Sequence, residues 1–228
     1  MSFKQSLIRV RVWDLPTRLF HWALAFCFTG LLFTGTVGGT AMSFHFRFGY
    51  AVLALLLFRL VWGVVGGRWS RFSSFLFGPK ATLAYLKGHS TSDQRVGHSP
   101  LAALSVFALL AFLTAQVATG LVSDDEISFA GPLTHLVSNA TVSLATSYHA
   151  DIGKWILLAL VLLHLGAVVY YTRRQHRLVS AMIHGDKLLA MTARPSRDDV
   201  PARLLALFIF VLCATAAYGV STLQAPAF

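Results

Sequence analysis

Charged side chains are scarce in this sequence of 228 residues. Asp, Glu, Lys and Arg together make up 12% of the chain, whereas hydrophobic residues make up 56%. Soluble globular domains carry about a quarter of charged residues, so this composition excludes an ordinary soluble domain. Cysteine is scarcer still: Cys27 and Cys213 both fall in long apolar runs, which favours simple packing and excludes a disulfide framework.

Acidic residues are fewer than basic ones, and the formal net charge is +10. A strongly basic chain can bind nucleic acid, but here the Lys and Arg residues gather in the segments between apolar runs. The sequence shows no basic helix and no aromatic platform for bases. We therefore expect no nucleic-acid partner, and anionic membrane lipid as the partner of these charges.

Five apolar runs have about the ~20 residues that a membrane-spanning helix needs. They cover residues 18–38, 47–66, 101–122, 153–172 and 204–222. The sequence therefore predicts an all-α integral membrane protein. The outer segment 123–150 is expected to be a polar loop, and the amphipathic stretch Pro79–Lys87 is expected to lie along the membrane surface.

The distribution of charge predicts the orientation of the chain. Most Lys and Arg residues precede the first span, separate the second from the third, or separate the fourth from the fifth. The opposite side carries the acidic run Asp124–Glu126. By the positive-inside rule the N-terminus is cytoplasmic and the C-terminus lies outside. The first span, which begins near Asp14-Leu15-Pro16, is expected to be a retained helix rather than a cleaved signal peptide.

Four histidines lie in or beside the apolar runs: His21, His45, His149 and His164. Ionisable side chains are costly in lipid and mark functional sites there. His21 and His164 lie near the cytoplasmic ends of their spans, and His45 and His149 near the outer ends. His149 and His164 are 15 residues apart, roughly 22 Å along a helix, so the depths predict two separate pairs, His21–His164 and His45–His149.

Paired histidines at two depths indicate two haem groups. Two imidazoles fill both axial positions of haem iron, whereas a zinc site needs about four ligands close together. No C-x-x-C-H motif occurs, so the haem would be bound non-covalently. The alternative for any single histidine is a hydrogen-bonded structural role. The remaining histidines are expected to be mostly solvated: His89, His98, His135, His176 and His184.

Other residues near these histidines are candidate partners of the cofactors. Arg18 and Arg59 are candidates for binding haem propionates, and Arg59 also for lying near a quinone head group; the alternative for Arg59 is snorkelling to the membrane surface. Arg47 and Lys154 are outer candidates or simple interfacial anchors. A glycine follows each outer histidine by four residues (Gly49 and Gly153), which predicts a flat recess for a porphyrin. Gln116 has no assigned role.

The residues that carry these features resemble a known family. Val12 to Trp22, with the sequence VWDLPTRLFHW, resembles the opening of bacterial cytochrome b561 proteins and of the b-type cytochromes of nickel–iron hydrogenases. The similarity continues at His45-x-x-x-Gly49-Tyr50, at Leu57 to Gly63 and at His98-Ser99-Pro100-Leu101. It includes Gly131-Pro132-Leu133, His149 to His164 and Met182 to Gly185.

The resemblance covers about residues 10–187 and implies a four-helix bundle with two b haems bound by the first, second and fourth helices. We accordingly divide the chain into a four-helix dihaem cytochrome b domain (1–190) and an inner linker with a fifth transmembrane helix (191–228). The spacing from His149 to His164 is slightly longer than in the family. The fifth helix lies outside the four-helix core, so packing or partner docking is its expected role.

The resemblance implies a membrane dihaem cytochrome b of the bacterial inner membrane. It would transfer electrons between the quinone pool and a periplasmic redox partner such as a c-type cytochrome. By its charge, the acidic run Asp124–Glu126 is a candidate docking site for a basic partner, and the favoured alternative is an ordinary solvated loop. An electron-transfer protein is favoured over a stand-alone enzyme. The alternatives are a quinone-dependent oxidoreductase acting on a small molecule such as superoxide, a membrane anchor subunit of a hydrogenase or reductase, and a haem-free transporter.

Overall fold

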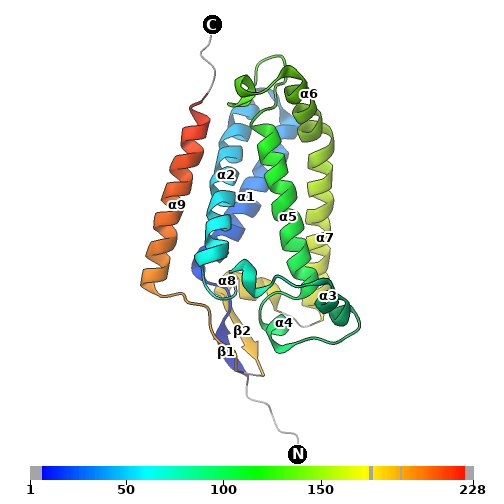
Figure 1. Ribbon diagram of the computed structural model, residues 1–228, viewed down its shortest axis with the longest axis vertical. Helices are drawn as coiled ribbons and strands as arrows, with labels where there is room; N and C mark the ends of the chain where they lie inside the picture. Colours follow the sequence, from blue (N-terminus) through cyan, green and yellow to red (C-terminus); the bar gives the residue numbers. More distant parts are fainter. Residues whose placement is uncertain (1–6, 175–176, 191, 224–228) are drawn as a thin grey trace, which may run out of the picture. The chain divides into compact units, whose positions relative to one another are not determined.

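The computed structural model describes residues 7–174, 177–190 and 192–223. Most of the described chain is helical (Figure 1). Five helices in the described ranges are long and apolar enough to cross a membrane: α1 (Leu15–Val37), α2 (Met42–Val65), α5 (Pro100–Gly120), α7 (Lys154–Arg173) and α9 (Val200–Ser221). Each overlaps one predicted span, which confirms the prediction of an all-α integral membrane protein.

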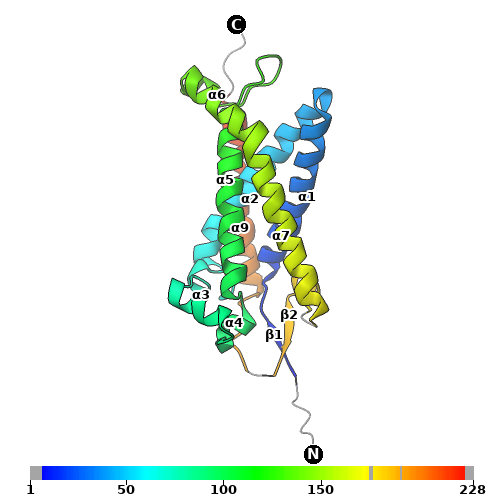
Figure 2. The ribbon, with the colours of Figure 1, turned by 90° about the vertical axis from the view of Figure 1, so that its right-hand side faces the viewer.

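The fourth span differs from its prediction at its outer end. Helix α6 (Asn139–Ser147) continues through a π-helical segment, Tyr148–Gly153, directly into α7 (Figure 2). The prediction of a loop over the whole of 123–150 is therefore wrong for its second half. The start of α6 is stabilised locally, because the Ser138 side chain accepts a hydrogen bond from the Thr141 amide at 3.3 Å.

Packing divides the chain into two compact units, and each of the five long helices contributes residues to both. Unit 1 comprises Met1–Leu19, Arg59–Phe107 and Leu163–Leu207. Unit 2 comprises Phe20–Phe58, Ala108–Leu162 and Phe208–Phe228.

Unit 1 contains a small sheet and several short helices. Strands β1 (Ile8–Arg11) and β2 (Asp186–Leu189) pair antiparallel, with Ile8 opposite Leu189 and Arg11 opposite Asp186 (Figure 1). The short helices are α3 (Pro79–Leu86), α4 (Ser92–Val96) and α8 (Leu178–His184). The buried apolar cluster consists of Val10, Val12, Trp13, Trp69, Val96 and Ala181. Burial of these side chains fixes the loops between the long helices.

A buried carboxylate organises the polar interior of unit 1. Asp14 is 0% exposed and accepts hydrogen bonds from the Thr17 amide at 2.9 Å, Ser70 Oγ at 2.6 Å and Trp62 Nε1 at 3.2 Å. Arg59, which is 4% exposed, donates to the carbonyl oxygen of Ser70 at 3.0 Å. Burial of a charge is costly without such partners, so this network ties the first turn of α1 to the end of α2 and the segment after it.

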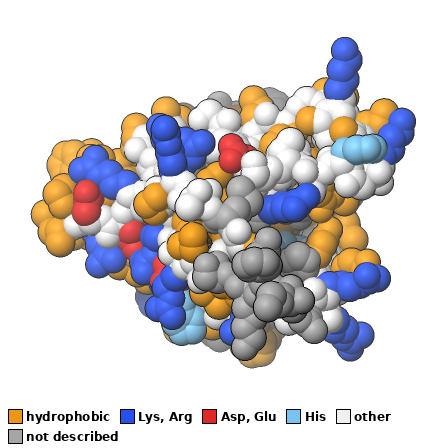
Figure 3. All heavy atoms as spheres, turned by 90° about the horizontal axis from the view of Figure 1, so that it is seen from below, with side chains coloured by type: hydrophobic (Ala, Val, Ile, Leu, Met, Phe, Trp, Pro, Cys, Tyr) orange, Lys and Arg blue, Asp and Glu red, His pale blue; other side chains and the backbone are white. Residues whose placement is uncertain are grey.

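A second carboxylate of unit 1, that of Asp198, is also largely buried. The Asp198 carboxylate accepts hydrogen bonds from Arg11, from Arg203 Nε at 3.0 Å and from the Leu15 amide at 3.0 Å. Burial alone would raise the pKa of Asp198, but the hydrogen bonds from Arg203, Leu15 and Arg11 lower it below its ordinary value. Lys and Arg side chains outnumber acidic ones on the face of unit 1 that carries β1 and β2 (Figure 3).

Unit 2 contains the remaining parts of the five long helices together with α6. The Phe58 ring on α2 lies 6.5 Å from that of Phe20 on α1 and 6.0 Å from that of Phe210 on α9. Close approach of α1 and α2 is possible at Gly30, where an added Cβ would lie 2.6 Å from the Phe48 ring. On α9, Ile209, Cys213 and Ala217 are buried. These contacts frame two cavities.

Candidate functional site

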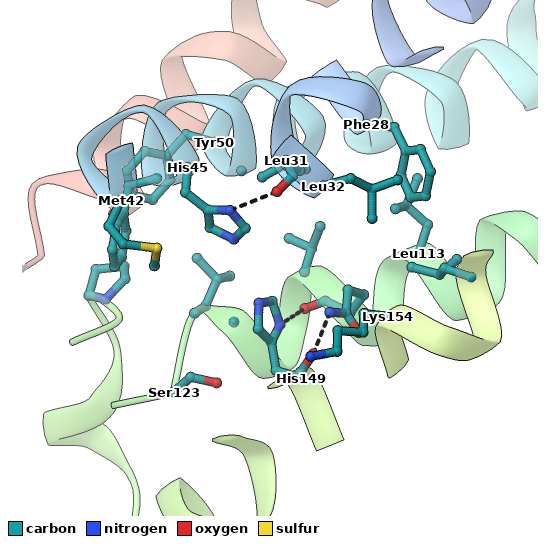
Figure 4. Close-up of a pocket in the computed structure, with 18 residues that line it drawn as sticks. Phe28, Leu31, Leu32, Met42, His45, Tyr50, Leu113, Ser123, His149 and Lys154 are labelled. Atoms are coloured by element: carbon teal, nitrogen blue, oxygen red, sulfur yellow. Dashed lines mark hydrogen bonds between the residues drawn. The ribbon is translucent and has the colours of Figure 1, made fainter. Parts of the chain in front are cut away.

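His45 and His149 face each other in unit 2. His45 lies in the first turn of α2, and His149 lies in the π-helical segment Tyr148–Gly153. Their ring centroids are 6.1 Å apart and the ring planes are 84° apart (Figure 4). The fold therefore brings together the two histidines of the predicted outer pair, which are more than one hundred residues apart in the sequence.

Each ring is held by a hydrogen bond from one nitrogen. His45 Nδ1 lies 3.2 Å from the carbonyl oxygen of Leu31 and 3.3 Å from Thr34 Oγ1, and His149 Nδ1 lies 2.8 Å from the carbonyl oxygen of Gln116. Because a carbonyl oxygen only accepts, each Nδ1 carries the proton and each Nε2 keeps its lone pair. This is the tautomer of a metal-ligating histidine whose other nitrogen is fixed by the backbone.

Two glycines on neighbouring helices make room for the rings. A Cβ added to Gly35 would lie 3.1 Å from the His45 ring, and one added to Gly120 would lie 2.7 Å from the His149 ring. Gly49 has open space beside it and lines the cavity, as predicted for a recess. Gly153 instead packs against the Gln116 side chain, so the predicted recess below His149 is absent. The helix is π-helical there, which changes the face on which Gly153 lies.

Gln116 holds His149 through two hydrogen bonds. The side-chain Nε2 of Gln116 donates to the carbonyl oxygen of His149 at 2.8 Å, and the backbone carbonyl oxygen of Gln116 accepts from His149 Nδ1. The two bonds connect α5 to the π-helical segment and fix both the backbone and the ring of His149. Glutamine in an apolar helix was the only sequence signal for this contact.

The histidines line a cavity with apolar walls (Figure 4). Its empty space, including the part open to the outside, is about 950 Å³. The apolar lining includes Phe28, Leu31, Leu32, Met42, Phe46, Leu113, Val117 and Leu157, and the polar lining includes Tyr50, Ser123, His149 and Lys154. Sites for cofactors are typically mostly apolar cavities with a few placed polar groups. Lys154 thus lines this cavity, whereas the predicted Arg47 does not.

The site offers two histidine ligands and no larger ligand set. No group of three or more His, Cys, Asp or Glu side chains that could hold a bare metal ion occurs among the described residues. Two imidazole nitrogens, each about 2 Å from one metal atom, require ring centres several ångströms apart, and the observed separation of 6.1 Å meets this requirement. The donor set therefore fits a metal whose other ligands come from a macrocycle.

The second predicted pair is divided between the units. His21 lies on α1 in unit 2, where its ring centroid is 5.1 Å from that of Trp22, and His164 lies on α7 in unit 1. Both side chains are partly buried. The pairing of His21 with His164 stays a prediction.

The two predicted arginines have protein partners in unit 1. Arg18 Nη1 donates to the carbonyl oxygen of Ile183, and Arg18 Nη2 lies 3.9 Å from the Asp198 carboxylate. The Arg59 guanidinium lies 4.6 Å from the centre of the Phe72 ring in addition to its bond to Ser70. Arg59 is buried within unit 1, and its predicted role near a propionate or quinone and the snorkelling alternative both stay predictions.

The other histidines differ in their exposure. His89, His135 and His184 are exposed as predicted, and His176 lies outside the described residues. His98 departs from the prediction, because its ring packs between Trp13 at 4.8 Å and Phe75 at 4.2 Å and its Nδ1 is shielded from solvent. Burial, together with the positive charges of Arg59 and Lys187, lowers the pKa of His98 to about 3.

The fold and the site together define a class: a helical integral membrane protein with a facing pair of histidines suited to haem iron. The family described as prokaryotic cytochrome b561 matches residues 12–185, and the chain belongs to this family. It is similar to a probable Ni/Fe-hydrogenase B-type cytochrome subunit of Bradyrhizobium diazoefficiens, with 25% identity over 214 residues covering 78% of this chain and 85% of the relative. The protein is accordingly a membrane b-type cytochrome of electron transport, with haem b as its cofactor.

Proposed function

We propose that this protein is a dihaem cytochrome b that carries electrons across the bacterial inner membrane between the quinone pool and a periplasmic redox protein. The observation that carries the proposal is the facing pair His45–His149, each ring fixed by a backbone carbonyl at Nδ1 and free to bind metal at Nε2. The supporting observations are the family membership and the five apolar helices.

His45 and His149 would hold the outer haem through their Nε2 atoms. When bound, haem b would supply a one-electron redox couple, and coordination by two imidazoles suits electron transfer. The protein orients the site: the backbone carbonyl oxygens of Leu31 and Gln116 and the Thr34 hydroxyl fix the rings, and the apolar walls exclude water. Exclusion of water and the hydrogen bonds to the ligands set the redox potential.

His21 and His164 would hold the inner haem, and Arg18 and Arg59 remain the proposed partners of its propionates. Arg18 and Arg59 both lie in unit 1, as does His164, although each already binds a carbonyl oxygen. Guanidinium groups have five donors and can serve more than one acceptor. The proposed domain division, 1–190 for the dihaem core and 191–228 for the linker and fifth helix, follows the end of the family match at residue 185.

The proposed orientation places the N-terminus in the cytoplasm and the C-terminus in the periplasm. The basic face of unit 1 supports it, because positive charge is retained on the cytoplasmic side and contacts anionic lipid there. The periplasmic partner would be a c-type cytochrome that docks near the acidic run Asp124–Glu126. That run is ordered by Asp125, whose carboxylate accepts hydrogen bonds from the amides of Ile127, Ser128 and Phe129.

A second candidate function is that of a membrane anchor for a hydrogenase-like enzyme. The printed name of the relative from Bradyrhizobium diazoefficiens favours it. The partner would then be the enzyme rather than a c-type cytochrome, and the electron path through the membrane would be the same. Co-purification of the tagged chain from its own membranes with a partner containing covalent haem, or with one containing a nickel centre, decides between the two.

The first test is haem quantitation with a reduced-minus-oxidised visible spectrum. The wild type is expected to contain two low-spin b haems per chain, and His149→Ala and His164→Ala are each expected to contain one. His135→Ala, which changes an exposed histidine of the outer loop, is the matched control and should keep both. One haem that survives His149→Ala would reduce the proposal to a single inner centre, and absence of haem would leave the transporter alternative standing.

Superoxide chemistry is tested with the same preparations. If the purified protein without any partner reduced quinone at the expense of superoxide, and His149→Ala abolished this reaction, the oxidoreductase alternative would replace the relay. The relay predicts that the purified protein without a partner consumes no superoxide.

A further inference from the structure

A second cavity in unit 2 lies among α1, α2 and α9. Its empty space, including the part open to the outside, is about 1220 Å³. Its lining includes the small residues Ala23, Ala51, Ala54, Ala214 and Ala217. Since α9 begins after residue 185, one wall of this cavity comes from outside the region that the family match covers. Small side chains on all three helices keep the space open.

The cavity is polar at one end and apolar at the other. On α2 the polar residues Arg47 and Tyr50 precede Ala54 and Leu55, whereas on α9 Phe210 precedes Tyr218 and Ser221. The 6.0 Å separation of the Phe58 and Phe210 rings shows that later residues of α2 lie beside earlier residues of α9. The polar side chains of the two helices therefore gather at the same end. An amphipathic molecule with one polar head matches this distribution.

Two polar groups at that end have unused bonding capacity. The Tyr50 hydroxyl oxygen is shielded from solvent and has no hydrogen-bond partner among the described residues. A buried hydroxyl without a partner is destabilising, so a ligand that accepts its hydrogen bond would be favoured. The Arg47 guanidinium contacts the Phe44 ring at 5.3 Å and forms no ion pair within the described part of the chain. Both groups are donors, which favours a head with acceptor oxygens.

The same aromatic side chains separate this cavity from the histidine cavity. Phe46 and Tyr50 line both, and His45 lies one residue before Phe46 on the same helix. An occupant of the second cavity would lie one aromatic layer away from the proposed outer haem. A position this close to the proposed outer haem favours a redox-active occupant. A structural phospholipid would not need to lie near a haem.

We propose that the cavity among α1, α2 and α9 is a binding site for a membrane quinone. The Tyr50 hydroxyl and the Arg47 guanidinium would donate to a quinone carbonyl, and the apolar tail would lie along Ala54, Leu55 and Phe210. Neutral acceptor oxygens on a flat ring suit these donors and the alanine-lined walls. This inference rests on the proposed function, which calls for a quinone as one redox partner, and it adds the place and the residues that bind it.

The test measures quinone binding to the full chain in lipid nanodiscs. The probe is a ubiquinone with a short isoprenoid tail, and bound quinone per protein is determined after extraction. Tyr50→Phe removes one hydrogen bond and should weaken binding roughly three- to tenfold. Ala214→Trp fills the cavity and should abolish binding. Ala216→Trp is the matched control, because Ala216 lies on the exposed side of α9 outside the cavity. It should bind like the wild type.

Haem content, read from the visible spectrum of the same samples, separates this inference from the proposed function. We expect it to be unchanged in Ala214→Trp and Ala216→Trp. Loss of haem in His149→Ala without loss of quinone binding would support both. A wild type with no haem and intact, Tyr50-dependent quinone binding would refute the proposed function and leave this site standing.

Three results would overturn the quinone site. The first is unchanged quinone binding in Ala214→Trp and Tyr50→Phe. The second is a bound phospholipid that Ala214→Trp displaces while quinone binding stays the same, which would make the cavity a lipid site. The third is a changed haem spectrum in Tyr50→Phe with unchanged quinone binding, which would assign the hydroxyl to the histidine cavity. Tyr50→Phe serves as the test if Ala214→Trp does not fold.

Discussion

The buried carboxylates of unit 1 and the facing histidines of unit 2 are hydrogen-bonded in different ways. In unit 1 the carboxylate of Asp14 is surrounded by three donors, and Asp198 binds two arginines and a backbone amide. In unit 2, His45 and His149 each use one nitrogen for a backbone carbonyl and direct the other side of the ring to a cavity. Buried polar groups whose hydrogen-bonding atoms all have partners stabilise the fold. A buried histidine that uses only one of its two ring nitrogens can still bind a ligand with the other.

The difference indicates that unit 1 mainly stabilises the fold, whereas unit 2 mainly provides space for ligands. Unit 1 links segments distant in sequence through ion pairs and a small sheet, and its side chains fix where the long helices begin or end. Unit 2 has small residues at the positions where bulk would close a cavity, as at Gly35, Gly120 and Ala214. Substitutions in unit 1 should therefore change stability first, and substitutions in unit 2 should change cofactor content first.

The largest expected effect comes from Asp14→Ala. It removes the common acceptor of three buried donors, the Thr17 amide, Ser70 Oγ and Trp62 Nε1, so the free energy of unfolding should fall by about 3–5 kcal/mol. Thermal unfolding in detergent measures this. Asp93→Ala is the control, because the Asp93 side chain is 66% exposed and should cost little. Equal melting of both variants would contradict the structural role of Asp14.

Gly120→Val should break the cofactor site without the same loss of stability. Its side chain would collide with the His149 ring, since an added Cβ already lies 2.7 Å away, and such overpacking costs about 1–3 kcal/mol. We expect loss of the outer haem and retention of the inner one, measured by haem per protein. Gly219→Val on α9, where no atom lies within 4 Å of an added Cβ, is the control. Retention of both haems in Gly120→Val would argue against His149 as a ligand.

His98 should make unit 1 sensitive to acid. The pKa is about 6.5 in the unfolded chain and about 3 in the folded one, so the unfolded state binds the proton first as the pH falls. Stability is complete above pH 6.5 and decreases below it, by at most about 2 kcal/mol at pH 5. Unfolding curves between pH 7 and pH 5 measure the slope. His98→Gln should flatten it, whereas His89→Gln, at an exposed site, should not.

Thr34→Val should have the smallest effect. It removes the hydroxyl beside His45 Nδ1, while the Leu31 carbonyl still accepts from the ring. We expect both haems to remain and the outer haem to be lost about fivefold faster to a haem-binding acceptor protein, in line with one modest hydrogen bond. Thr36→Val, whose hydroxyl binds only the Leu32 carbonyl within α1, should lose haem at the rate of the wild type.

The helices and the outer histidine pair were predictable from the sequence because both follow from the cost of polar groups in lipid. Runs of about 20 apolar residues have few alternatives to a spanning helix. His45 and His149 stand out against such runs, and their matching depths predicted their pairing.

Features that depend on contacts between distant residues were not predictable. The β1–β2 pair joins residues about 175 positions apart, and its short strands carry no periodic pattern. Gly35 and Gly120 matter because of rings on other helices, and the burial of His98 depends on Trp13 and Phe75. Tyr50 looked like part of a family motif, and its place in the lining of both cavities depends on contacts between distant helices.

The π-helical turn at Tyr148–Gly153 explains how the chain tolerates its long interval between His149 and His164. A π turn takes up one residue more than an α turn over nearly the same rise. An insertion in this segment is thus absorbed locally, and His149, which lies within the segment, keeps its place opposite His45. Deleting one residue between His149 and Gly153 should turn the bulge into regular α-helix with little movement of either end. The π-helical segment can therefore take up a change in chain length beside His149 without moving α7.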